Sequence, residues 1–486
     1  MSLLWARLLV FGSSAAVLVI EILAGRLMAP YVGVTLETFT GIIGVVLAGI
    51  AAGAWLGGRS ADRVEPRQLL GPMLVLSGVL VLLAPTLVDW VGPSMRAGGP
   101  AEITILTASA FFWPSLTLST VTPIVVKLRL RSLEETGSVV GSLSAVGTIG
   151  ALAGTFVTGF MLLAAMPSRS LVLVVGALLV VVGLPLLVRS ASRGVTALGV
   201  IAAFGAGGGL MLEDGPCDVE TTYFCASIEV DPANPSGRTL RLDTLRHSYV
   251  DLEDPTHLEF RYSRIMADVV AELADGPLDI AYIGGGGFTL PRYFAAVRPG
   301  TTAIVFEIDG ELVELVEDEL GLVLTDELRV DIGDARLALP DEADGGYDVV
   351  VGDAFGGLSV PWHLTTREFL EEIDRVLSDD GVYVINLIDY PPLGFAHAET
   401  ATFLEVFDHV AVASTFERLN GSQGGNYVLI GAQHELDWAS ISARILERGG
   451  FDALLAGAAA EAFANGARVL RDDFAPVDQL LGAPPR

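Results

Sequence analysis

The chain has 486 residues, a formal net charge of −29 and a mean hydropathy of +0.56. It is too long for one ordinary domain and too apolar for a soluble protein, so a membrane part is expected. Residues 1–212 carry 12 basic and 8 acidic residues, a net of +4, whereas residues 213–486 carry 17 and 50, a net of −33. The acidic part should repel nucleic acid and anionic lipid headgroups and attract small cations, which argues against nucleic-acid binding.

Seven apolar runs, each long enough at roughly 20 residues to cross a bilayer, precede the acidic part. They lie at residues 8–28, 39–58, 69–91, 103–126, 138–165, 170–188 and 195–212. The first run is not a cleavable signal peptide, because further apolar runs follow it at once. We therefore expect a multi-pass α-helical bundle of about seven helices over residues 1–212, embedded in the plasma membrane.

Polar and small residues inside these runs predict how the helices pack. Glycines recur every four residues at two places, which lets helix backbones approach closely. These glycines are Gly49, Gly53 and Gly57, and then Gly150 and Gly154. Glu21 lies within the first run and Arg26 near its end, where a charge is costly unless it is paired. We interpret them as a structural Glu21–Arg26 pair, or as polar contacts to a neighbouring helix, rather than as a transport site.

Basic residues gather in every second loop between the predicted spans, and loops of this kind stay in the cytoplasm. The second, fourth and sixth loops hold Arg59, Arg63, Arg67, Lys127, Arg129, Arg131, Arg189 and Arg193. The intervening loops hold only Arg96 and Arg169. With an inside N-terminus and seven crossings, the acidic part is predicted to lie outside the cytoplasm, and in the cytoplasm if one span is miscounted.

The chain has only two cysteines, Cys217 and Cys225, which follow the seventh run closely. They flank a short polar turn that can close into a hairpin and bring their α-carbons within bonding range. A disulfide persists only in an oxidising compartment, so this pair agrees with the extracytoplasmic prediction.

The acidic part begins with alternating strands and continues with strands that alternate with helices. Residues 213–255 have short alternating runs broken by Pro and Gly, which predicts a small β-hairpin domain. From residue 256 to 486 the pattern predicts a Rossmann-like α/β domain with a mostly parallel sheet. The expected strands are 278–283, 302–307, 328–331, 347–352 and 381–388, and the expected helices are 289–297, 310–319 and 366–377.

The first of these strands runs directly into a glycine-rich turn and a helix. Gly284, Gly285 and Gly286 let the backbone approach a ligand closely and leave the helix N-terminus free to face it. The next strand ends in Glu307 and Asp309, about 20 residues on, where an acid can accept hydrogen bonds from both hydroxyls of a ribose. This spacing is typical of nucleoside-binding sites.

Two further strands also end in acidic residues. Asp334 and Ala335 follow the third strand, and Asp353 follows the fourth. Open α/β sheets bind their ligands at the carboxyl ends of parallel strands, so we count these residues as candidates for the same site. The structural alternatives are a helix N-cap for Asp334 and a turn position for Asp353.

The motifs occur in the order found in one known family. The family patterns Leu-x-Leu-Asp-Gly-x-x-Gln, Phe-x-Tyr, Gly-Gly-Gly-Asp-Gly-Gly-x-x-Arg-Glu, Glu-Ile-Asp and Asp-x-x-Asp fall on residues 240–247, 260–262, 284–293, 307–309 and 353–356. Residues 238–432 therefore resemble the spermidine synthase family of aminopropyltransferases. The whole chain is similar to bacterial membrane-fused members of that family.

The resemblance implies a role for each matched residue. It implies that Glu307 holds the ribose, that Asp334 holds the adenine amino group, and that Tyr262 and Asp353 bind the attacking amine, with Asp353 as general base. His247 replaces a glutamine that contacts the donor in the family. The chain departs from the family at two acidic positions, which are Gly287 and Gly356 here.

The leading hypothesis is a membrane-anchored aminopropyltransferase, a transferase of polyamine biosynthesis. Decarboxylated S-adenosylmethionine, or S-adenosylmethionine itself, is expected as a co-substrate, with no tightly bound cofactor. The expected partners are a small cationic amine or polyamine and the lipid bilayer, and a homodimer is left open. Six scattered His and two Cys show no metal-ligand spacing. The alternatives are an S-adenosylmethionine-dependent methyl or alkyl transferase, and a catalytically silent nucleoside-sensing or docking domain on a membrane bundle.

Overall fold

The computed structural model describes residues 2–96, 99–130, 132–190, 193–212, 215–449 and 452–483. The predicted loop cation Arg131 and the predicted domain boundary at residues 213–214 lie outside the described residues. The chain divides into two compact units, Met1–Cys225 and Ala226–Arg486.

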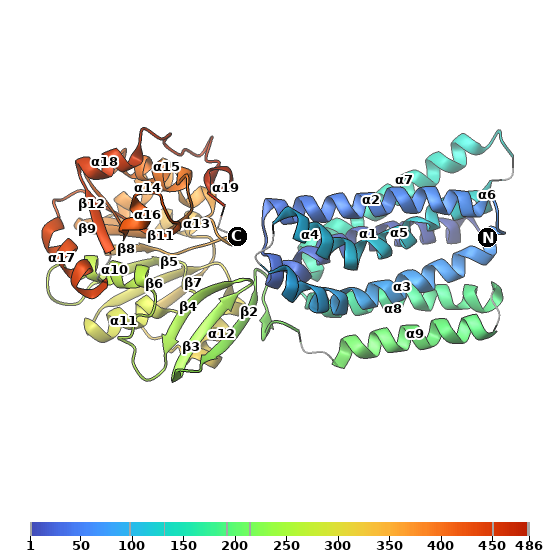
Figure 1. Cartoon of the computed structure of the whole chain (residues 1–486), viewed down its shortest axis with the longest axis horizontal. Coiled ribbons are helices and arrows are strands. Elements are labelled where there is room, and N and C mark those ends of the chain that lie inside the picture. The colour runs from blue at the N-terminus through green and yellow to red at the C-terminus, as the bar shows by residue number, and fades with distance from the viewer. Residues whose placement is uncertain are drawn as a thin grey trace. The chain divides into compact units, whose positions relative to one another are not determined.

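The first unit is a bundle of long apolar helices (Figure 1). Six helices over the described residues are long and apolar enough to cross a membrane, and they match the first six predicted runs. They are α1 (Leu3–Val32), α2 (Leu36–Ala61), α3 (Pro66–Val91, extended by the turn Gly92–Met95), the span Pro100–Arg129, α7 (Thr136–Val157, extended by Thr158–Leu162) and α8 (Ser168–Ser190). The span Pro100–Arg129 consists of α4 (Pro100–Thr107), a π-helical turn Ala108–Phe112, α5 (Trp113–Ser119) and α6 (Val121–Arg129). The seventh predicted run forms α9 (Arg193–Leu212), of which Thr196–Gly209 is a shorter apolar helix.

The predicted close packing at glycines is confirmed. A Cβ added to Gly53 would lie 2.1 Å from the Leu116 carbonyl oxygen on α5. One added to Gly150 on α7 would lie 2.3 Å from the Phe11 carbonyl oxygen on α1. Both distances are far below van der Waals contact, so only glycine allows these helix pairs to approach so closely.

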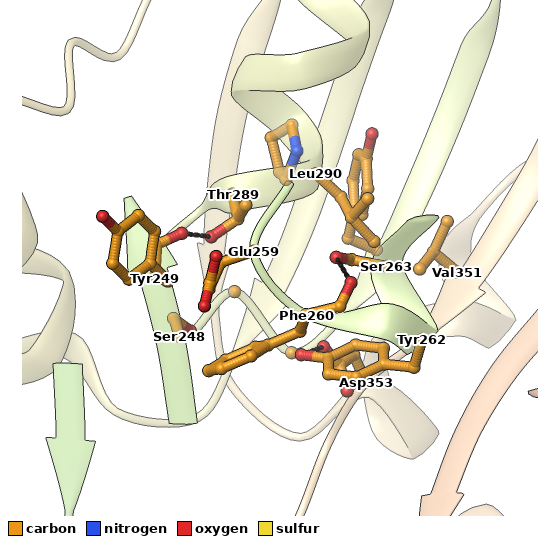
Figure 2. A pocket seen from close by; sticks show the side chains of 14 residues that line it. Ser248, Tyr249, Glu259, Phe260, Tyr262, Ser263, Thr289, Leu290, Val351 and Asp353 are labelled. Atoms are coloured by element: carbon orange, nitrogen blue, oxygen red, sulfur yellow. Dashed lines mark hydrogen bonds between the residues drawn. The ribbon is translucent and has the colours of Figure 1, made fainter. Parts of the chain in front are cut away.

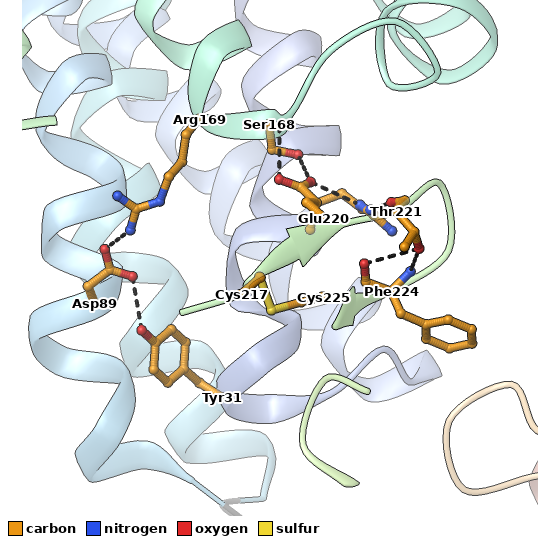
Figure 3. Close-up of a disulfide and its surroundings, with 10 residues drawn as sticks. Tyr31, Asp89, Ser168, Arg169, Cys217, Glu220, Thr221, Phe224 and Cys225 are labelled. Atoms are coloured by element: carbon orange, nitrogen blue, oxygen red, sulfur yellow. Dashed lines mark hydrogen bonds and ion pairs between the residues drawn. A yellow bond between two sulfur atoms is a disulfide. The ribbon is translucent and has the colours of Figure 1, made fainter. Parts of the chain in front are cut away.

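Hydrogen bonds and ion pairs join polar residues at one end of the bundle (Figure 3). The Glu220 carboxylate accepts a hydrogen bond from the Ser168 backbone N–H at 3.0 Å and lies 3.5 Å from Arg26 Nε. The predicted Glu21–Arg26 pair is therefore wrong. Arg26 instead reaches Glu220, which follows α9 in the sequence, because a partner at the helix end lies outside the apolar region where an isolated charge is costly. Beside it, Asp89 is paired with Arg169 and accepts a hydrogen bond from Tyr31 at 2.9 Å.

The same network shows to which end of the bundle the chain returns after α9. Arg26 lies near the end of α1 and Ser168 at the start of α8, so both belong to the end opposite the beginning of α1. Glu220 contacts both residues. Residue 220 therefore lies at the same end of the bundle as the end of α1.

The second unit begins with an antiparallel meander, as predicted for the hairpin region. Strand β1 (Val219–Glu220) belongs to the first unit, and β2 (Cys225–Asp231) pairs with β3 (Asn234–Leu242), which pairs with β4 (Leu245–Asp251). Asp243 begins the two-residue turn between β3 and β4 with φ 52°.

An eight-stranded sheet with the order β12-β10-β11-β9-β8-β5-β6-β7 forms the rest of this unit (Figure 1). The five strands from β9 to β7 are parallel, and β11, β10 and β12 are added antiparallel. The strands are β5 (Asp279–Ile283), β6 (Thr302–Glu307), β7 (Leu328–Ile332), β8 (Tyr347–Gly352), β9 (Leu377–Asp389), β10 (His409–Thr415), β11 (Gly425–Ala432) and β12 (Asp452–Ala456). The predicted α/β order and mostly parallel sheet are confirmed.

Helices follow the strands and cover the sheet. They are α10 (Arg261–Val270), α11 (Thr289–Val297), α12 (Gly310–Leu320), α13 (Ala335–Ala338), α14 (Arg367–Val376), α15 (Gly394–Phe403), α16 (Phe416–Leu419), α17 (Trp438–Gly449), α18 (Ala458–Ala464) and α19 (Val477–Leu480), with short turns at Leu339–Asp341 and Trp362–Leu364. A continuous apolar core joins alternate residues of β5 and β8 to α14 and α15.

The structure joins Cys217 and Cys225 in a disulfide with a Cα–Cα distance of 5.2 Å (Figure 3). Together with the basic loops, and with Glu220 at the end of the bundle where α1 ends, this predicts that the cysteines face an oxidising compartment. A membrane-impermeant thiol reagent applied to intact cells should label the protein only after reduction.

The variant Cys225→Ser leaves the half-buried Cys217 thiol without its disulfide partner and should be labelled without reduction, which controls for access of the reagent. Labelling of both proteins only after the cells are lysed would place the cysteines on the cytoplasmic side.

Candidate active site

The pairing of three parallel strands brings the predicted site residues together. β5 lies between β6 and β8, in register at Ile283↔Phe306 and Ile283↔Gly352. The carboxyl ends of these strands, with Gly284, Glu307 and Asp353, therefore lie at one edge of the sheet. This edge is where open α/β sheets bind their ligands.

The glycine-rich turn after β5 needs glycine for both conformation and space. Gly284 has φ +92° and Gly286 has φ +50°, a region that other residues rarely adopt. A Cβ on Gly284 would lie 2.6 Å from the Asp353 carbonyl oxygen. The turn is thus held directly against the backbone that follows β8.

Glu307 is 6% exposed and already holds the glycine-rich turn in place. Its Oε2 accepts hydrogen bonds from the backbone N–H groups of Gly285 at 2.8 Å and Gly286 at 3.4 Å. Its Oε1 accepts one from the Asp309 N–H at 3.1 Å. Burial raises the pKa of Glu307, and these backbone donors partly oppose that rise. Three of the roughly four acceptor sites of the carboxylate are thus occupied, so one site on Oε1 is left for a ligand hydroxyl.

The residues beside Glu307 have different environments. Ile308 is 42% exposed, which leaves an apolar side chain beside the carboxylate. Asp309 is 1% exposed and caps α12, accepting a hydrogen bond from the Leu312 N–H at 3.2 Å. Asp309 therefore fixes the helix that follows Glu307.

Asp334 and Ala335 lie after the edge strand β7. Asp334 Oδ1 accepts a hydrogen bond from the Arg336 N–H at 2.9 Å, which is the N-cap that the sequence offered as an alternative. Its Oδ2 lies 3.2 Å from His363 Nε2. Ala335 is 5% exposed and packs in the apolar core. In the part of the chain that the structure describes, no hydrogen bond or ion pair joins these residues to the glycine-rich turn.

Asp353 accepts two side-chain hydrogen bonds, and Figure 2 shows Tyr262 beside it. Tyr262 Oη donates to Asp353 Oδ2 at 3.0 Å, and Asn386 Nδ2 donates to Oδ1 at 2.9 Å. Asn426 in turn donates to Asn386 at 3.0 Å and fixes its amide. Burial raises the pKa of Asp353 to about 6, although both hydrogen bonds favour the charged form. A carboxyl group with this pKa can accept a proton near neutral pH.

A pocket extends from Asp353 between β4, α10 and α11. Its lining includes Glu259, Phe260, Tyr262, Tyr282 and Asp353. Two carboxylates line this pocket, and none of the described residues that line it is Lys, Arg or His. Tyr282 is 2% exposed, and its hydroxyl has no hydrogen-bond partner in the described structure. The charge of the pocket favours a cationic ligand.

His247 lies on β4, close to both the glycine-rich turn and the loop after Asp353. Its Nδ1 would lie 3.0 Å from a Cβ on Gly286, and its ring meets Phe355 edge-on at 6.4 Å between centroids. Nδ1 is buried and has no hydrogen-bond partner in the described structure. Burial lowers the pKa of His247 to about 4, so the ring is neutral at pH 7.

Gly287 and Gly356, where the resemblance implied acids in the family, have opposite surroundings. Gly287 donates a hydrogen bond to Ser248 Oγ at 2.9 Å, and a Cβ on Gly287 would lie 2.8 Å from Ser248 Cβ. Ser248 thus occupies the space that a longer residue at position 287 would need. A Cβ on Gly356 would meet nothing within 4 Å. The Gly356 N–H donates a hydrogen bond to the Ser359 carbonyl oxygen at 2.8 Å, and this bond forms a short loop. The Ser359 hydroxyl donates to Asp478 Oδ1 at 2.8 Å.

Comparisons with known proteins find relatives among the polyamine aminopropyltransferases and the spermidine synthases. No protein-family model matches the chain. A polyamine aminopropyltransferase of Vibrio vulnificus is 36% identical over 133 residues, which cover 27% of this chain and 44% of that protein. One of Chromobacterium violaceum is 31% identical over 168 residues, covering 31% and 57%. The chain therefore spans about half the length of these curated relatives.

A crystal structure of a probable spermidine synthase from Corynebacterium glutamicum is 30% identical with a TM-score of 0.50. The match covers 53% of this chain and 97% of that one. The chain belongs to the spermidine synthase family. Of the residues in the family pattern, Tyr262 donates a hydrogen bond to Asp353, and Glu307 accepts one from the glycine-rich turn. His247 lies beside this turn and beside the loop after Asp353.

Sequence reasoning missed three residues of this spermidine synthase-like site. Asn386 is 2% exposed and interrupts an otherwise apolar strand, a signal that could have revealed it. Ser248 and Glu259 belong to segments whose fold the sequence does not predict in detail, so nothing indicated that they face the pocket.

Gly287 and Gly356 should respond differently to a methyl group. Gly287→Ala should lower the free energy of unfolding of the second unit by about 1–3 kcal/mol, because the new Cβ overpacks Ser248. Gly356→Ala should change it by less than about 0.5 kcal/mol, since the space is open. Denaturant unfolding followed by tryptophan fluorescence measures both, and equal losses would contradict the packing described for Gly287.

Glu307→Gln should weaken binding of methylthioadenosine by about 10–100-fold, because a charged acceptor of hydrogen bonds is lost from a buried site. Asp309→Asn is the control, since asparagine caps a helix as well as aspartate does. Isothermal titration calorimetry measures both affinities. An unchanged affinity in Glu307→Gln would remove Glu307 from the nucleoside site.

Proposed function

We propose that the second unit is an aminopropyltransferase that moves an aminopropyl group from decarboxylated S-adenosylmethionine to a small amine. The observation that carries this proposal is the Asp353 carboxylate, bonded to Tyr262 and Asn386, in a pocket whose described lining has two carboxylates and no Lys, Arg or His. A half-buried carboxylate of raised pKa suits a base, and the acidic pocket suits an amine.

In the proposed reaction, the lone pair of a neutral amine attacks the aminopropyl methylene carbon that is bonded to the sulfonium sulfur of the donor. The C–N bond forms as the C–S bond breaks, and the electron pair of the broken bond goes to sulfur. Methylthioadenosine leaves as a neutral thioether. The proton of the new ammonium group passes to Asp353 and then to solvent. Because the sulfonium is already a good leaving group, the protein needs only to align the reactants and accept this proton.

The adenosine part of the donor is proposed to bind at the glycine-rich turn. Glu307 would accept hydrogen bonds from the ribose hydroxyls, and Ile308 offers an exposed apolar surface for the base. Asp334 would receive the adenine amino group, with Ala335 packed beneath it. Gly284 to Gly286 give the backbone room to approach the donor, and Asp309 supports the site by capping α12. His247, neutral at pH 7, would face the donor without adding charge.

The first unit is proposed to anchor this enzyme in the plasma membrane. Six described helices of sufficient length and apolarity support that role. The basic loops and the disulfide support an extracytoplasmic second unit.

A second candidate follows from the disulfide. If the second unit faces an oxidising compartment, it is separated from cytosolic adenosyl donors, and it could sense or dock a nucleoside without turnover. Nucleoside binding without product formation would favour this candidate over the transferase.

The test of the proposed base is its pH dependence. Asp353 is protonated below its pKa of about 6 and cannot then accept a proton, so kcat/KM should rise with pH through about 6. Asp353→Asn should lower kcat by at least about 100-fold. Methylthioadenosine formation from the decarboxylated donor and putrescine provides the assay.

Asp348→Asn on the same strand is a matched control, because Asp348 lies at the other end of β8, where it accepts a hydrogen bond from the Asp279 N–H. An acidic limb near pH 4, or a variant at position 353 that keeps most of the wild-type rate, would exclude Asp353 as the base.

A further inference from the structure

The first unit contains a cavity that the proposed transferase reaction does not use. Its volume is about 380 Å³, which is within the range of small-molecule binding sites. Residues of α1, α2, α7 and of α5 together with α6 line it. All these helices belong to the unit Met1–Cys225, so the cavity is separate from the candidate active site.

The lining of this cavity is rich in hydroxyl groups. The residues that carry them are Ser13, Ser14, Ser119, Thr122, Ser144 and Thr148. Ser13 Oγ donates to the Val10 carbonyl oxygen at 3.2 Å, and Thr148 Oγ1 donates to the Ser144 carbonyl oxygen at 3.1 Å. The other four hydroxyls have no hydrogen-bond partner among the described residues. They are therefore available as donors to an occupant of the cavity.

The cavity lies at the depth of the lipid acyl chains when the first unit spans the membrane as proposed. Ile50 comes nine residues before Arg59 on α2, and Ser119 comes eight residues before Lys127 on α6. These separations correspond to roughly 12–14 Å along a helix, against a hydrocarbon core of about 30 Å. Bulk water does not solvate polar groups at this depth, and a hydroxyl without a partner is costly there. The free hydroxyls thus favour an occupant with polar atoms.

The cavity opens between α2 and α7, on the surface of the bundle. Ala54 on α2 and both Ser144 and Thr148 on α7 line the cavity and are exposed. These two helices are also the least buried of the six membrane spans over the described residues. None of the described residues that line the cavity is Lys, Arg, His, Asp or Glu. A ligand is therefore expected to be uncharged and to enter from the lipid.

We propose that this cavity binds the head group of a neutral lipid-soluble quinone, with the apolar tail extending between α2 and α7 into the acyl chains. The free hydroxyls of Ser14, Thr122 and Ser144 come from three different helices. A quinone ring carries carbonyl oxygens on opposite edges, so it can accept hydrogen bonds from more than one of these helices. Phospholipids and diacylglycerols keep their oxygen atoms near the hydrated membrane surface. The inference goes beyond the proposed transferase and rests only on the proposed membrane position of the first unit.

The test measures binding of decylubiquinone, a quinone with a ten-carbon tail, to the full chain in phosphatidylcholine nanodiscs. Saturable binding above the level of empty nanodiscs is expected. Thr122→Val, which keeps the shape of the side chain, should weaken binding by about tenfold, and so should Ser14→Ala. Ser142→Ala is the matched control on α7. Ser142 is outside the cavity lining and its hydroxyl donates to the Val139 carbonyl oxygen at 3.2 Å, so this variant should keep the affinity within about threefold.

A variant at the mouth and a competing lipid test the location and the class of the ligand. Ser144→Leu places a larger apolar side chain between α2 and α7 and should abolish saturable binding. Dioleoylglycerol, which is neutral but has no ring, should not compete with the quinone. The inference is overturned by competition from dioleoylglycerol, by unchanged affinity in both Thr122→Val and Ser144→Leu, or by the absence of saturable binding to the wild type.

Two controls separate this inference from the proposed function. Thr122→Val should leave the rate of methylthioadenosine formation unchanged, because Thr122 lies in the first unit. Quinone binding without any transferase turnover would support the quinone site and count against the transferase. Release of the chain from membranes by a carbonate wash would refute both the membrane anchor and the quinone site, whatever the transferase rate.

Discussion

The parallel pairing of β5 with β6 on one side and β8 on the other determines where the chemistry of this protein can occur. Register fixes Ile283 opposite Phe306 and Gly352, so three strand ends coincide at one edge. The glycine-rich turn can then lie against the backbone after β8, and Glu307 can reach its N–H groups. A shift of one residue would turn the alternating side chains to the opposite face of the sheet and separate these groups.

Burial gives the acids at this edge their properties. Glu307 is held by three backbone donors, which pay part of the cost of desolvating a carboxylate. Burial nevertheless raises the pKa of Glu307, and it raises the pKa of Asp353, which has two side-chain donors, to about 6. Both acids lie at the same edge of the sheet, at the ends of β6 and β8, which β5 separates.

Much of this arrangement could be predicted from the sequence, because it depends on local patterns. The strand ending at Glu307 and the one ending at Gly352 have the predicted bounds, since short apolar runs bounded by glycine and acidic residues are unambiguous there. The fold class, the glycine-packed helices and the family followed from similar signals. The N-cap at Asp334 was also foreseeable from its position before a helix.

The remainder depends on contacts between distant segments, which local patterns do not encode. Arg26 pairs with Glu220, almost 200 positions away, rather than with Glu21 on its own helix. Asn386 reaches Asp353 only because β9 lies beside β8. That Ser248 fills the space beside Gly287 depends on how β4 packs on the glycine-rich turn.

The most direct test of the central claim is to identify the group transferred to the acceptor. The purified full chain is incubated with decarboxylated S-adenosylmethionine and putrescine, in parallel with intact S-adenosylmethionine, and the products are analysed by mass spectrometry. The account predicts an aminopropylated acceptor and an equal amount of methylthioadenosine from the decarboxylated donor only. A methylated acceptor with S-adenosylhomocysteine from the intact donor, or no product from either donor, would contradict it.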